Sequence, residues 1–538
     1  MAPKSAHLPK RVIDIGSLDG TSAPRLYESQ GEAGEYAALS YCWGRTPAFT
    51  TTAATLASRL QGISWNELPK TLQDAIKLAR CLGLQYIWID SLCIVQDDGK
   101  DWEEQASQMA SIYEAAYITI AATQSAATTQ GFLSNRDLDH ELVHQISKKE
   151  RVSTFVRPKI DHSWLESQYL TEHQFERPGM EIAAKFQYPL FDRAWCFQER
   201  ILSTRVLYVT DQEYFFQCRC GSRCECCRMG GADTGAGEAK DAYIAILTDS
   251  SPSSIKISNA YGKQFQLWEY IVADYTSKNL TFFKDRLPAL SGIASRMPKE
   301  IMGEYVAGLW RTGLLYGLLW ERHYLSDSLR PTTYTGPTFS WVSITGSVRW
   351  NQEIHPFHTL RATILEAHCV PKSLDSFGEV TSGFLRLKGL LTTASFAQYC
   401  KGETSSKKSS ALYKDGKMTY LTCDLKADEH LANCDILQDP IYDDSGSCPS
   451  TFGFAPGTLF MTSEPTVLYC FQLLVNPYGN PGPSSVDWFK EKTYRDFNAT
   501  SLVLRKFGEG EGMFKRMGIA TVPCSWFDDK EEMEVTIV

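Results

Sequence analysis

The sequence predicts a doubly wound, parallel α/β sheet in the N-terminal half, followed by a helical region and a β-rich C-terminal region. Strand and helix patterns alternate as far as residue 218, and such alternation requires parallel pairing through right-handed crossovers. From about residue 338 onward, short β segments are instead separated by turns rich in Gly, Pro and Asp. We therefore expect four parts: an α/β domain at 1–227, a linker or long loop at 228–260, a helical extension at 261–345 and a β-rich region at 346–538.

The first elements follow from apolar periodicity and from end signals. Residues 37–41 form a short apolar run that predicts a strand. A helix begins after Pro69, carries apolar side chains at i, i+3, i+4 and i+7, and ends before Gly83, a residue typical of helix C-termini. The run at 86–89 then predicts a buried strand that ends on Asp90.

The remaining elements continue this alternation. Asp101 and Glu104 have the spacing of a capping pair and predict a helix whose apolar face includes Trp102 and Tyr113. The same signals predict strands at 117–121, 205–210 and 213–218 and a helix at 192–203. Farther along they predict a helix at 265–275 and β segments at 338–344, 384–391, 458–462, 466–474 and 501–507.

Composition narrows the classes of function. The 538 residues have a formal net charge of −9 and no dense Lys/Arg run, which argues against nucleic acid as a partner. The N-terminus lacks the apolar core of a signal peptide, and the longest strongly apolar stretch, at 314–320, is too short to span a bilayer. We therefore expect a cytoplasmic protein without a membrane span, whose 16 cysteines are reduced thiols.

Ligands of a doubly wound sheet bind beyond the carboxyl ends of its strands. The segments expected there include Ser40–Gly44 and Asp90–Asp98. Trp43 can stack on a base or belong to the core, and Asp90 can contact a substrate or cap the turn that follows it. The residues expected to bind a substrate or cofactor are Ser40, Tyr41, Trp43, Asp90, Ser91, Cys93 and Trp195.

Five cysteines lie within ten residues at 218–227. Paired thiolates at short spacing can hold zinc, but these spacings do not form a double C-x2-C pattern and no nearby histidine completes a ligand set. Free thiols without a metal are therefore the expected state. The candidates for zinc, should it bind, are Cys218, Cys220, Cys224 and Cys226.

Three blocks of sequence carry a family resemblance. They are YAALSYCWG at 36–44, LGLQYIWIDSLCIVQDD at 82–98 and DRAWCFQERILS at 192–203. In this order, with further motifs over roughly residues 8–350, they resemble the fungal heterokaryon-incompatibility (HET) domain. HET domains are viewed as distant relatives of TIR domains, so the resemblance implies a TIR- or flavodoxin-like winding of the sheet.

The resemblance also implies a catalytic residue. The string Trp195-Cys196-x-x-Glu199 resembles the helix of TIR domains that holds their catalytic glutamate, which makes Glu199 the expected catalytic residue and NAD a candidate substrate. A carboxylate can stabilise the oxocarbenium-like state of glycosidic cleavage. The alternative is a buried ion pair between Glu199 and Arg193 or Arg205.

Three functions stay open at this point. The resemblance implies fungal self/non-self recognition and cell death, with NAD glycohydrolase activity. The alternatives are a biosynthetic enzyme of fungal secondary metabolism that takes a small organic substrate, and a non-catalytic module that acts by self-association. Catalysis requires Glu199 to face an open cleft, whereas an interaction module predicts a paired or buried Glu199.

A cysteine or serine hydrolase is a further alternative. The thiols of Cys42, Cys93 and Cys196 lie in or beside the motif blocks and are candidate nucleophiles. Because no histidine lies between His7 and His140, a general base must come from outside the first two blocks. Candidates for that base are His323, His355 and His358.

Overall fold

The computed structural model divides into two compact units, which are described separately. Unit 1 comprises Met1–Ile255 and Lys278–Leu280, and unit 2 comprises Lys256–Ser277 and Thr281–Val538. The structure describes residues 7–17, 19–44, 49–134, 140–147, 150–156, 188–227, 230–231, 238–249, 262–323, 329–350, 358–373, 375–400, 408–415, 417–423, 459–461, 467–476, 497–508 and 512–538.

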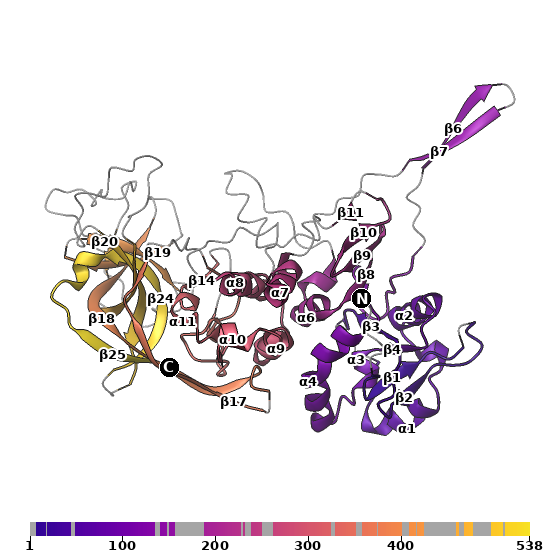
Figure 1. Ribbon diagram of the computed structural model, residues 1–538, viewed down its shortest axis with the longest axis horizontal. Coiled ribbons are helices and arrows are strands. Elements are labelled where there is room, and N and C mark those ends of the chain that lie inside the picture. Colours follow the sequence, from indigo (N-terminus) through magenta and orange to yellow (C-terminus); the bar gives the residue numbers. More distant parts are fainter. Residues whose placement is uncertain are drawn as a thin grey trace. The chain divides into compact units, whose positions relative to one another are not determined.

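Unit 1 is built on a mixed sheet with the strand order β11-β10-β9-β8-β5-β3-β4-β1-β2 (Figure 1). Neighbours among β8, β5, β3 and β4 pair in parallel, and the other neighbours are antiparallel. The sheet is therefore parallel at its centre and antiparallel at both edges, instead of parallel throughout as predicted. Its strands are β1 Arg11–Asp14, β2 Arg25–Glu28, β3 Tyr36–Ser40, β4 Tyr86–Trp88, β5 Ile118–Ala122, β8 Arg205–Val209, β9 Tyr214–Cys218, β10 Gly221–Cys224 and β11 Gly230–Gly231.

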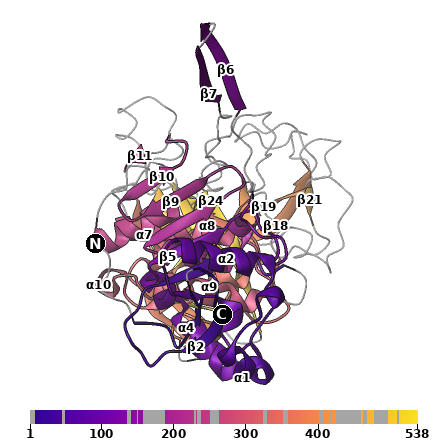
Figure 2. The same ribbon diagram turned by 90° about the vertical axis from the view of Figure 1, so that its right-hand side faces the viewer.

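The antiparallel edge beyond β8 follows from short connections. Between β8 and β9, the N–H of Thr210 donates to the C=O of Glu213 at 3.1 Å and closes a tight turn. Such a turn reverses the chain, whereas a parallel pair needs a crossover of about a dozen residues or more. The result is a β9–β10 ribbon that pairs with β8 through β9, and its two strands lie side by side in Figures 1 and 2.

The central strands reverse their order between β3 and β5. Counted along the chain from β3, the order β4-β3-β5-β8 reads 2-1-3-4. The chain passes from β3 to β4 on one side and then crosses to β5 on the other side of β3. In open α/β sheets, ligands bind at the carboxyl ends of strands where the order reverses in this way.

Helices cover the sheet of unit 1. Helix α2 lies on one side of β3 and β4, and α4 and α6 lie on the other (Figure 1). Gly83 follows α2 with a φ of 74°, a left-handed conformation that favours glycine, so the predicted helix end is confirmed. The helices are α1 Ala53–Gln61, η1 Trp65–Glu67, α2 Lys70–Cys81, α3 Asp90–Cys93, α4 Gly99–Ala115, η3 Pro189–Asp192, α6 Ala194–Leu202 and α7 Glu238–Thr248, and a separate hairpin joins β6 His140–Ser147 to β7 Glu150–Val156.

The start of α4 differs from the prediction. Asp98 is the N-cap, and its carboxylate accepts two backbone N–H groups of the first turn. Asp101, predicted to cap the helix, is buried and pairs with the guanidinium of Arg11, a partner that lies 90 residues away in the chain. This shift of the buried face leaves Trp102 exposed, while Tyr113 is buried as predicted.

Helix α7 lies within the stretch predicted to be a linker. Its residues Ala239, Ala242, Tyr243 and Ile246 are buried at the spacing i, i+3, i+4 and i+7 of a helix face. This apolar face explains why the segment folds despite its Gly- and Ser-rich surroundings. Residues 228–229, 232–237 and 250–260 lie outside the described part of the chain.

Unit 2 begins with short helices and hairpins. The helix predicted at 265–275 is confirmed as α8. Residues 338–344, predicted to be β, instead contain the 3-10 helix η5, because the Ser340 hydroxyl accepts the N–H of Val342 and caps a helical turn. The elements are α8 Lys263–Thr276, η4 Phe283–Arg286, α9 Pro288–Ala294, α10 Lys299–Met302, β12 Tyr305–Val306, β13 Leu309–Trp310, α11 Leu314–Gly317, β14 Trp320–Arg322, η5 Trp341–Ser343 and β15 Val348–Trp350.

The rest of unit 2 is the predicted β-rich region. Strands β22, β23, β24, β20, β19 and β18 pair in succession, and β18 pairs again with β22, so that these strands close on themselves. Arg516 in β24 is fully buried; it donates to the C=O of Leu318 at 2.6 Å and stacks on the ring of Trp320. The elements are β16 Thr359–Leu360, β17 Thr363–Pro371, β18 Val380–Cys400, β19 Lys408–Lys414, β20 Lys417–Cys423, β21 Leu459–Met461, β22 Val467–Asn476, β23 Asn498–Lys506, β24 Met513–Pro523, η8 Cys524–Phe527 and β25 Glu532–Ile537.

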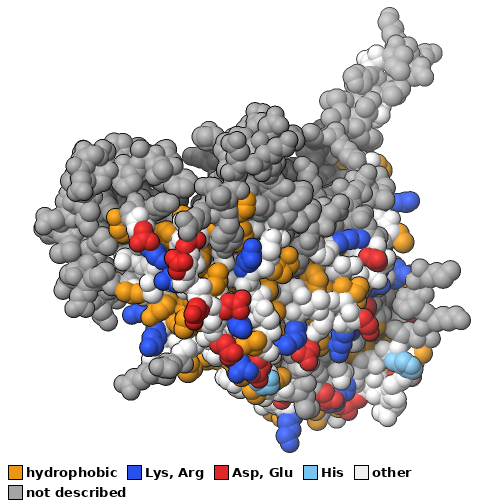
Figure 3. Space-filling view, turned by 60° about the vertical axis from the view of Figure 1, so that its left-hand side comes forward, with side chains coloured by type: hydrophobic (Ala, Val, Ile, Leu, Met, Phe, Trp, Pro, Cys, Tyr) orange, Lys and Arg blue, Asp and Glu red, His pale blue; other side chains and the backbone are white. Residues whose placement is uncertain are grey.

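The described surface has mixed chemistry. On the face shown in Figure 3, acidic and basic side chains are interspersed with small groups of hydrophobic ones. Among the helices that the structure describes, none combines the length and apolar character needed to cross a bilayer.

Candidate functional site

The carboxyl ends of β3 and β4 bring together most of the side chains predicted at the site. Tyr41 OH donates to Ser91 Oγ at 2.8 Å, and Trp43 Nε1 donates to Asp90 Oδ2 at 3.0 Å. The other carboxylate oxygen of Asp90 accepts the N–H of Ser91 at 2.6 Å. Asp90 therefore binds the turn that follows it and also fixes the half-buried ring of Trp43.

Helix α6 adds Glu199 to this group. The helix packs against β3 and α4; Gln198, Glu199 and Leu202 are buried, and Trp195 is half-buried. The side chain of Glu199 is only 5% exposed, and its Oε2 has no hydrogen-bond partner among the described residues. An unpartnered buried oxygen is costly, and it can accept a hydrogen bond from a ligand that reaches it.

The environment tunes the charge of Glu199. Burial raises the pKa of Glu199 to about 7; the charge of Asp90 adds to this effect, while Ser40, Arg193 and Tyr113 oppose it. Glu199 therefore changes its charge near neutral pH. The sequence did not assign Tyr113 to the site, although its predicted place on the buried face of α4 was a usable signal.

Arg193 supplies the positive charge of the site. It immediately precedes α6 and is half-buried. Burial lowers the pKa of its guanidinium, but the neighbouring Cys196, Cys42, Glu199 and Asp90 outweigh this effect and hold that pKa above its usual range. Two carboxylates and one guanidinium are thus grouped at the carboxyl ends of the central strands.

The structure does not pair Glu199 directly with an arginine. No ion pair within 4.0 Å of Glu199 is found among the described residues, so Arg193 acts on it only through attraction at longer range. Arg205 donates to the C=O of Tyr117 at 2.9 Å and lies over the ring of that residue. The ion-pair interpretation therefore finds no support in the described contacts.

The thiols near the site are protonated. Burial raises the pKa of Cys42, of Cys196 and, to about 12, of Cys93. Cys93 is fully buried and belongs to the hydrophobic core of unit 1. These shifts disfavour a thiolate nucleophile. Of the candidate bases, His323 and His358 belong to unit 2 and His355 lies outside the described residues.

A small cavity adjoins the point where the strand order reverses. Its volume of about 10 Å³ leaves room for roughly one water molecule. As it stands, this cavity is too small for an organic substrate, and Ser40 is common to its wall and to the surroundings of Glu199. Its lining residues are Ser40, Thr119, Ala121, Leu190, Phe191, Cys196, Phe197, Arg200, Val206 and Tyr208.

The segment that carries this site matches a known family. Residues 36–199 match the family model described as Heterokaryon incompatibility protein (HET). The chain carries a HET domain. The match begins with β3 and ends at Glu199, so it includes every residue of the group around Asp90, Arg193 and Glu199. Neither the curated proteins nor the solved structures contain a match to the chain.

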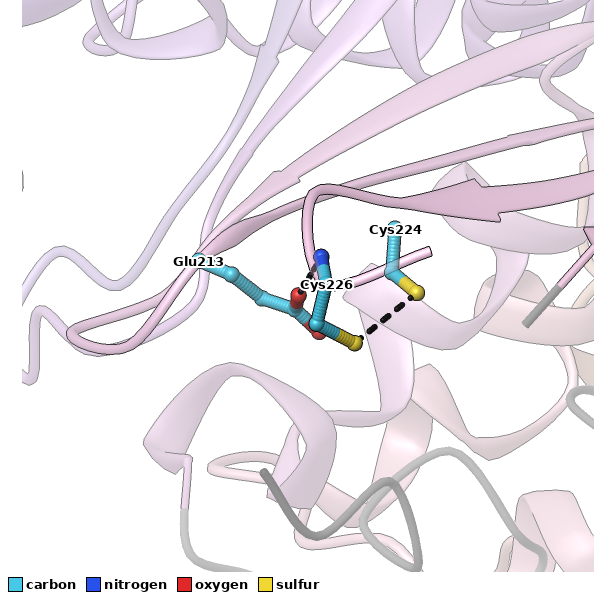
Figure 4. A group of neighbouring side chains, drawn as sticks. All are labelled: Glu213, Cys224 and Cys226. Atoms are coloured by element: carbon cyan, nitrogen blue, oxygen red, sulfur yellow. Dashed lines mark hydrogen bonds between the residues drawn. The ribbon is translucent and has the colours of Figure 1, made fainter. Parts of the chain in front are cut away.

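The cysteine cluster follows the HET domain match, and the structure divides it. Cys218 ends β9 and Cys220 lies in the turn after it, whereas Cys224 ends β10 at the opposite end of the hairpin. Cys226 and Cys224 face Glu213, a residue that the sequence analysis missed (Figure 4). The four predicted zinc candidates therefore do not form one group.

Proposed function

We propose that this HET domain acts in fungal self/non-self recognition by cleaving the nicotinamide–ribose bond of NAD, with Glu199 as the catalytic carboxylate. The observation that carries the proposal is a buried carboxylate with a pKa of about 7 and an unpartnered Oε2, beside Arg193 and Asp90. Groups with strongly shifted pKa values at the carboxyl edge of a sheet are typical of ligand-binding and catalytic sites.

Cleavage of the nicotinamide–ribose bond requires mainly that the protein position charged groups around the substrate. As the C–N bond to ribose breaks, its electron pair leaves with nicotinamide, which is neutral and needs no strong general acid. The ionised Glu199 would stabilise the oxocarbenium-like ribose. Water then adds to the ribosyl carbon, giving ADP-ribose and releasing a proton.

The neighbouring groups suit the rest of the substrate. Arg193 is half-buried and positively charged, which suits a diphosphate. Asp90, held by the indole of Trp43, can accept a ribose hydroxyl or the carboxamide N–H. The 2-1-3-4 order of the parallel strands agrees with the first four strands of a flavodoxin-like sheet and supports the proposed TIR-like winding.

Nicotinamide release from NAD by the purified full chain tests the proposal. Wild type and the control Glu103→Gln, which removes an exposed carboxylate on α4, should release nicotinamide, and Glu199→Gln should not. Because Glu199 must be ionised, the rate should rise with pH through about 7. Equal rates for Glu199→Gln and wild type would refute the assignment.

A non-catalytic module that acts by self-association is the second candidate. The observation that favours it is the 5% exposure of Glu199, because a substrate reaches this carboxylate only when a neighbouring side chain moves. Folded wild type that releases no nicotinamide, either as monomer or as assembled oligomer, would favour this second function. No described feature specifically favours the biosynthetic alternative.

A further inference from the structure

A second group of side chains with distinctive chemistry lies outside the HET domain match. Glu213, Cys224 and Cys226 each offer one ligand atom, and these atoms all lie within 4.8 Å of one another (Figure 4). We propose that the three residues bind a zinc ion that fixes the free end of the β9–β10 hairpin.

The strand register explains why these residues meet. In the β9–β10 pair, Cys224 lies opposite Phe215. Two residues farther along, the same register places Cys226 opposite Glu213, and the N–H of Cys226 donates to Glu213 Oε2 at 3.0 Å. Cys226 lies in the turn after β10, and this turn brings its Sγ to 3.2 Å from Sγ of Cys224. Three ligands thus converge from two chain segments.

The same register separates the other thiols from this group. Cys218 lies opposite Gly221 at the turn end of the hairpin. It also points to the other face, since Phe215 and Gln217 alternate with it and are buried. Cys220 is exposed in the turn itself. Cys218 and Cys220 are therefore outside the proposed site and serve as matched controls.

The sulfur geometry suits a metal better than a covalent bond. Sγ of Cys224 and Sγ of Cys226 are 3.2 Å apart. In a tetrahedral zinc site with Zn–S of about 2.3 Å, two sulfurs lie roughly 3.8 Å apart, so a small rotation of either side chain makes room for the ion. A disulfide instead requires the sulfurs to approach to about 2.05 Å.

The donor set selects the kind of ion. Thiolates favour zinc over magnesium or calcium, which prefer oxygen ligands alone. Glu213 is fully buried, and a buried carboxylate is stabilised by a bound cation as well as by hydrogen-bond donors. Three protein ligands leave one tetrahedral position for a water molecule.

The site has a structural role in unit 1. Glu213 closes the turn that joins β8 to β9, and Cys224 packs in the cluster of buried side chains that includes Tyr208 and Phe215. A zinc ion held by Glu213, Cys224 and Cys226 therefore ties the β8–β9 turn to the end of β10. Binding to the folded state alone stabilises that state in proportion to the logarithm of the zinc concentration.

Metal analysis of the full chain tests the proposal. Protein purified under reducing conditions is loaded with Zn²⁺, passed through a desalting column and measured by elemental mass spectrometry. Wild type and the control C218S/C220S should each retain about one zinc ion per chain. The variant C224S/C226S should lose it, and Glu213→Gln should bind it more weakly. In Co²⁺-loaded protein, the sulfur-to-cobalt charge-transfer band should follow the same pattern.

A second measurement does not depend on any variant folding. Zinc should slow the alkylation of Cys224 and Cys226 in wild type, and a chelator should restore the faster alkylation rate. Peptide mass spectrometry measures both rates. Folded wild type without zinc or without zinc-dependent protection of these two thiols would overturn the proposal. Loss of zinc from C218S/C220S, or a Cys224–Cys226 disulfide in the purified protein, would overturn it too.

Discussion

Replacement of Glu199 by glutamine should stabilise unit 1, and the gain should depend on pH. Burial raises the pKa of Glu199 from its ordinary 4.5 to about 7, so between these values the native chain binds a proton that the unfolded chain releases. The native state therefore loses stability as the pH rises from 4.5 to 7. At ~1.36 kcal/mol per unit of pKa, the ionised carboxylate costs about 3 kcal/mol at pH 8 and less than about 1 kcal/mol at pH 5.

Urea unfolding at pH 5 and pH 8 measures this difference. Hydrogen–deuterium exchange of peptides from β3 and α6 assigns the observed transition to unit 1. Glu199→Gln should raise the free energy of unfolding by about 2 to 3 kcal/mol more at pH 8 than at pH 5. The exposed-site control Glu103→Gln should change it little at either pH. An equal effect of Glu199→Gln at both pH values would refute the burial argument.

The same substitution separates stability from function. Under the proposed function, Glu199→Gln abolishes nicotinamide release while it stabilises the fold at neutral and higher pH. Such opposition is expected where a group is kept in an unfavourable environment for its chemistry. A substitution that lowers both nicotinamide release and the free energy of unfolding would instead leave the loss of activity explained by damage to the fold.

Two further substitutions test contacts that hold each unit together. Although burial opposes it, the hydrogen bonds with Arg11 help to hold the pKa of Asp101 at about 2, so Asp101→Asn should cost at least about 2 kcal/mol at pH 7. That difference should vanish in urea unfolding as the pH falls from about 4 to 2. Arg516→Met removes hydrogen bonds to buried carbonyl groups and the stack on Trp320, and should lower the thermal stability of unit 2 by about 3 kcal/mol. The control Arg505→Met, at an exposed position of β23, should leave it nearly unchanged, and equal losses would contradict the buried-arginine argument.

Much of the fold was predictable because its elements carry local signals. The apolar runs that became β3 and β4, the periodicity of α2 and the glycine after it all act within a few residues. The HET blocks were likewise predictable, and the family match confirms them. The capping role given to Asp101 was wrong, because a local spacing cannot reveal a competing partner 90 residues away.

The candidate site shows the same division. Sequence placed Tyr41, Trp43 and Asp90 at strand ends, and the structure adds the hydrogen bonds that join them. The sequence alone could not predict the raised pKa of Glu199, because the burial of this side chain depends on how α6 packs against β3 and α4. Nor could the thiol spacings reveal Glu213, which enters through strand register.

The sequence by itself determined the alternation of strands and helices, the presence of a HET domain and the positions of candidate side chains at strand ends. Only the tertiary structure decided which strands pair, which carboxylates are buried and which thiols meet Glu213. The physical reason is the sequence separation over which each interaction acts. Helix and strand propensity, capping and periodicity act over about one helical turn. Pairing, desolvation and charge coupling depend on segments that folding brings together from distant parts of the chain.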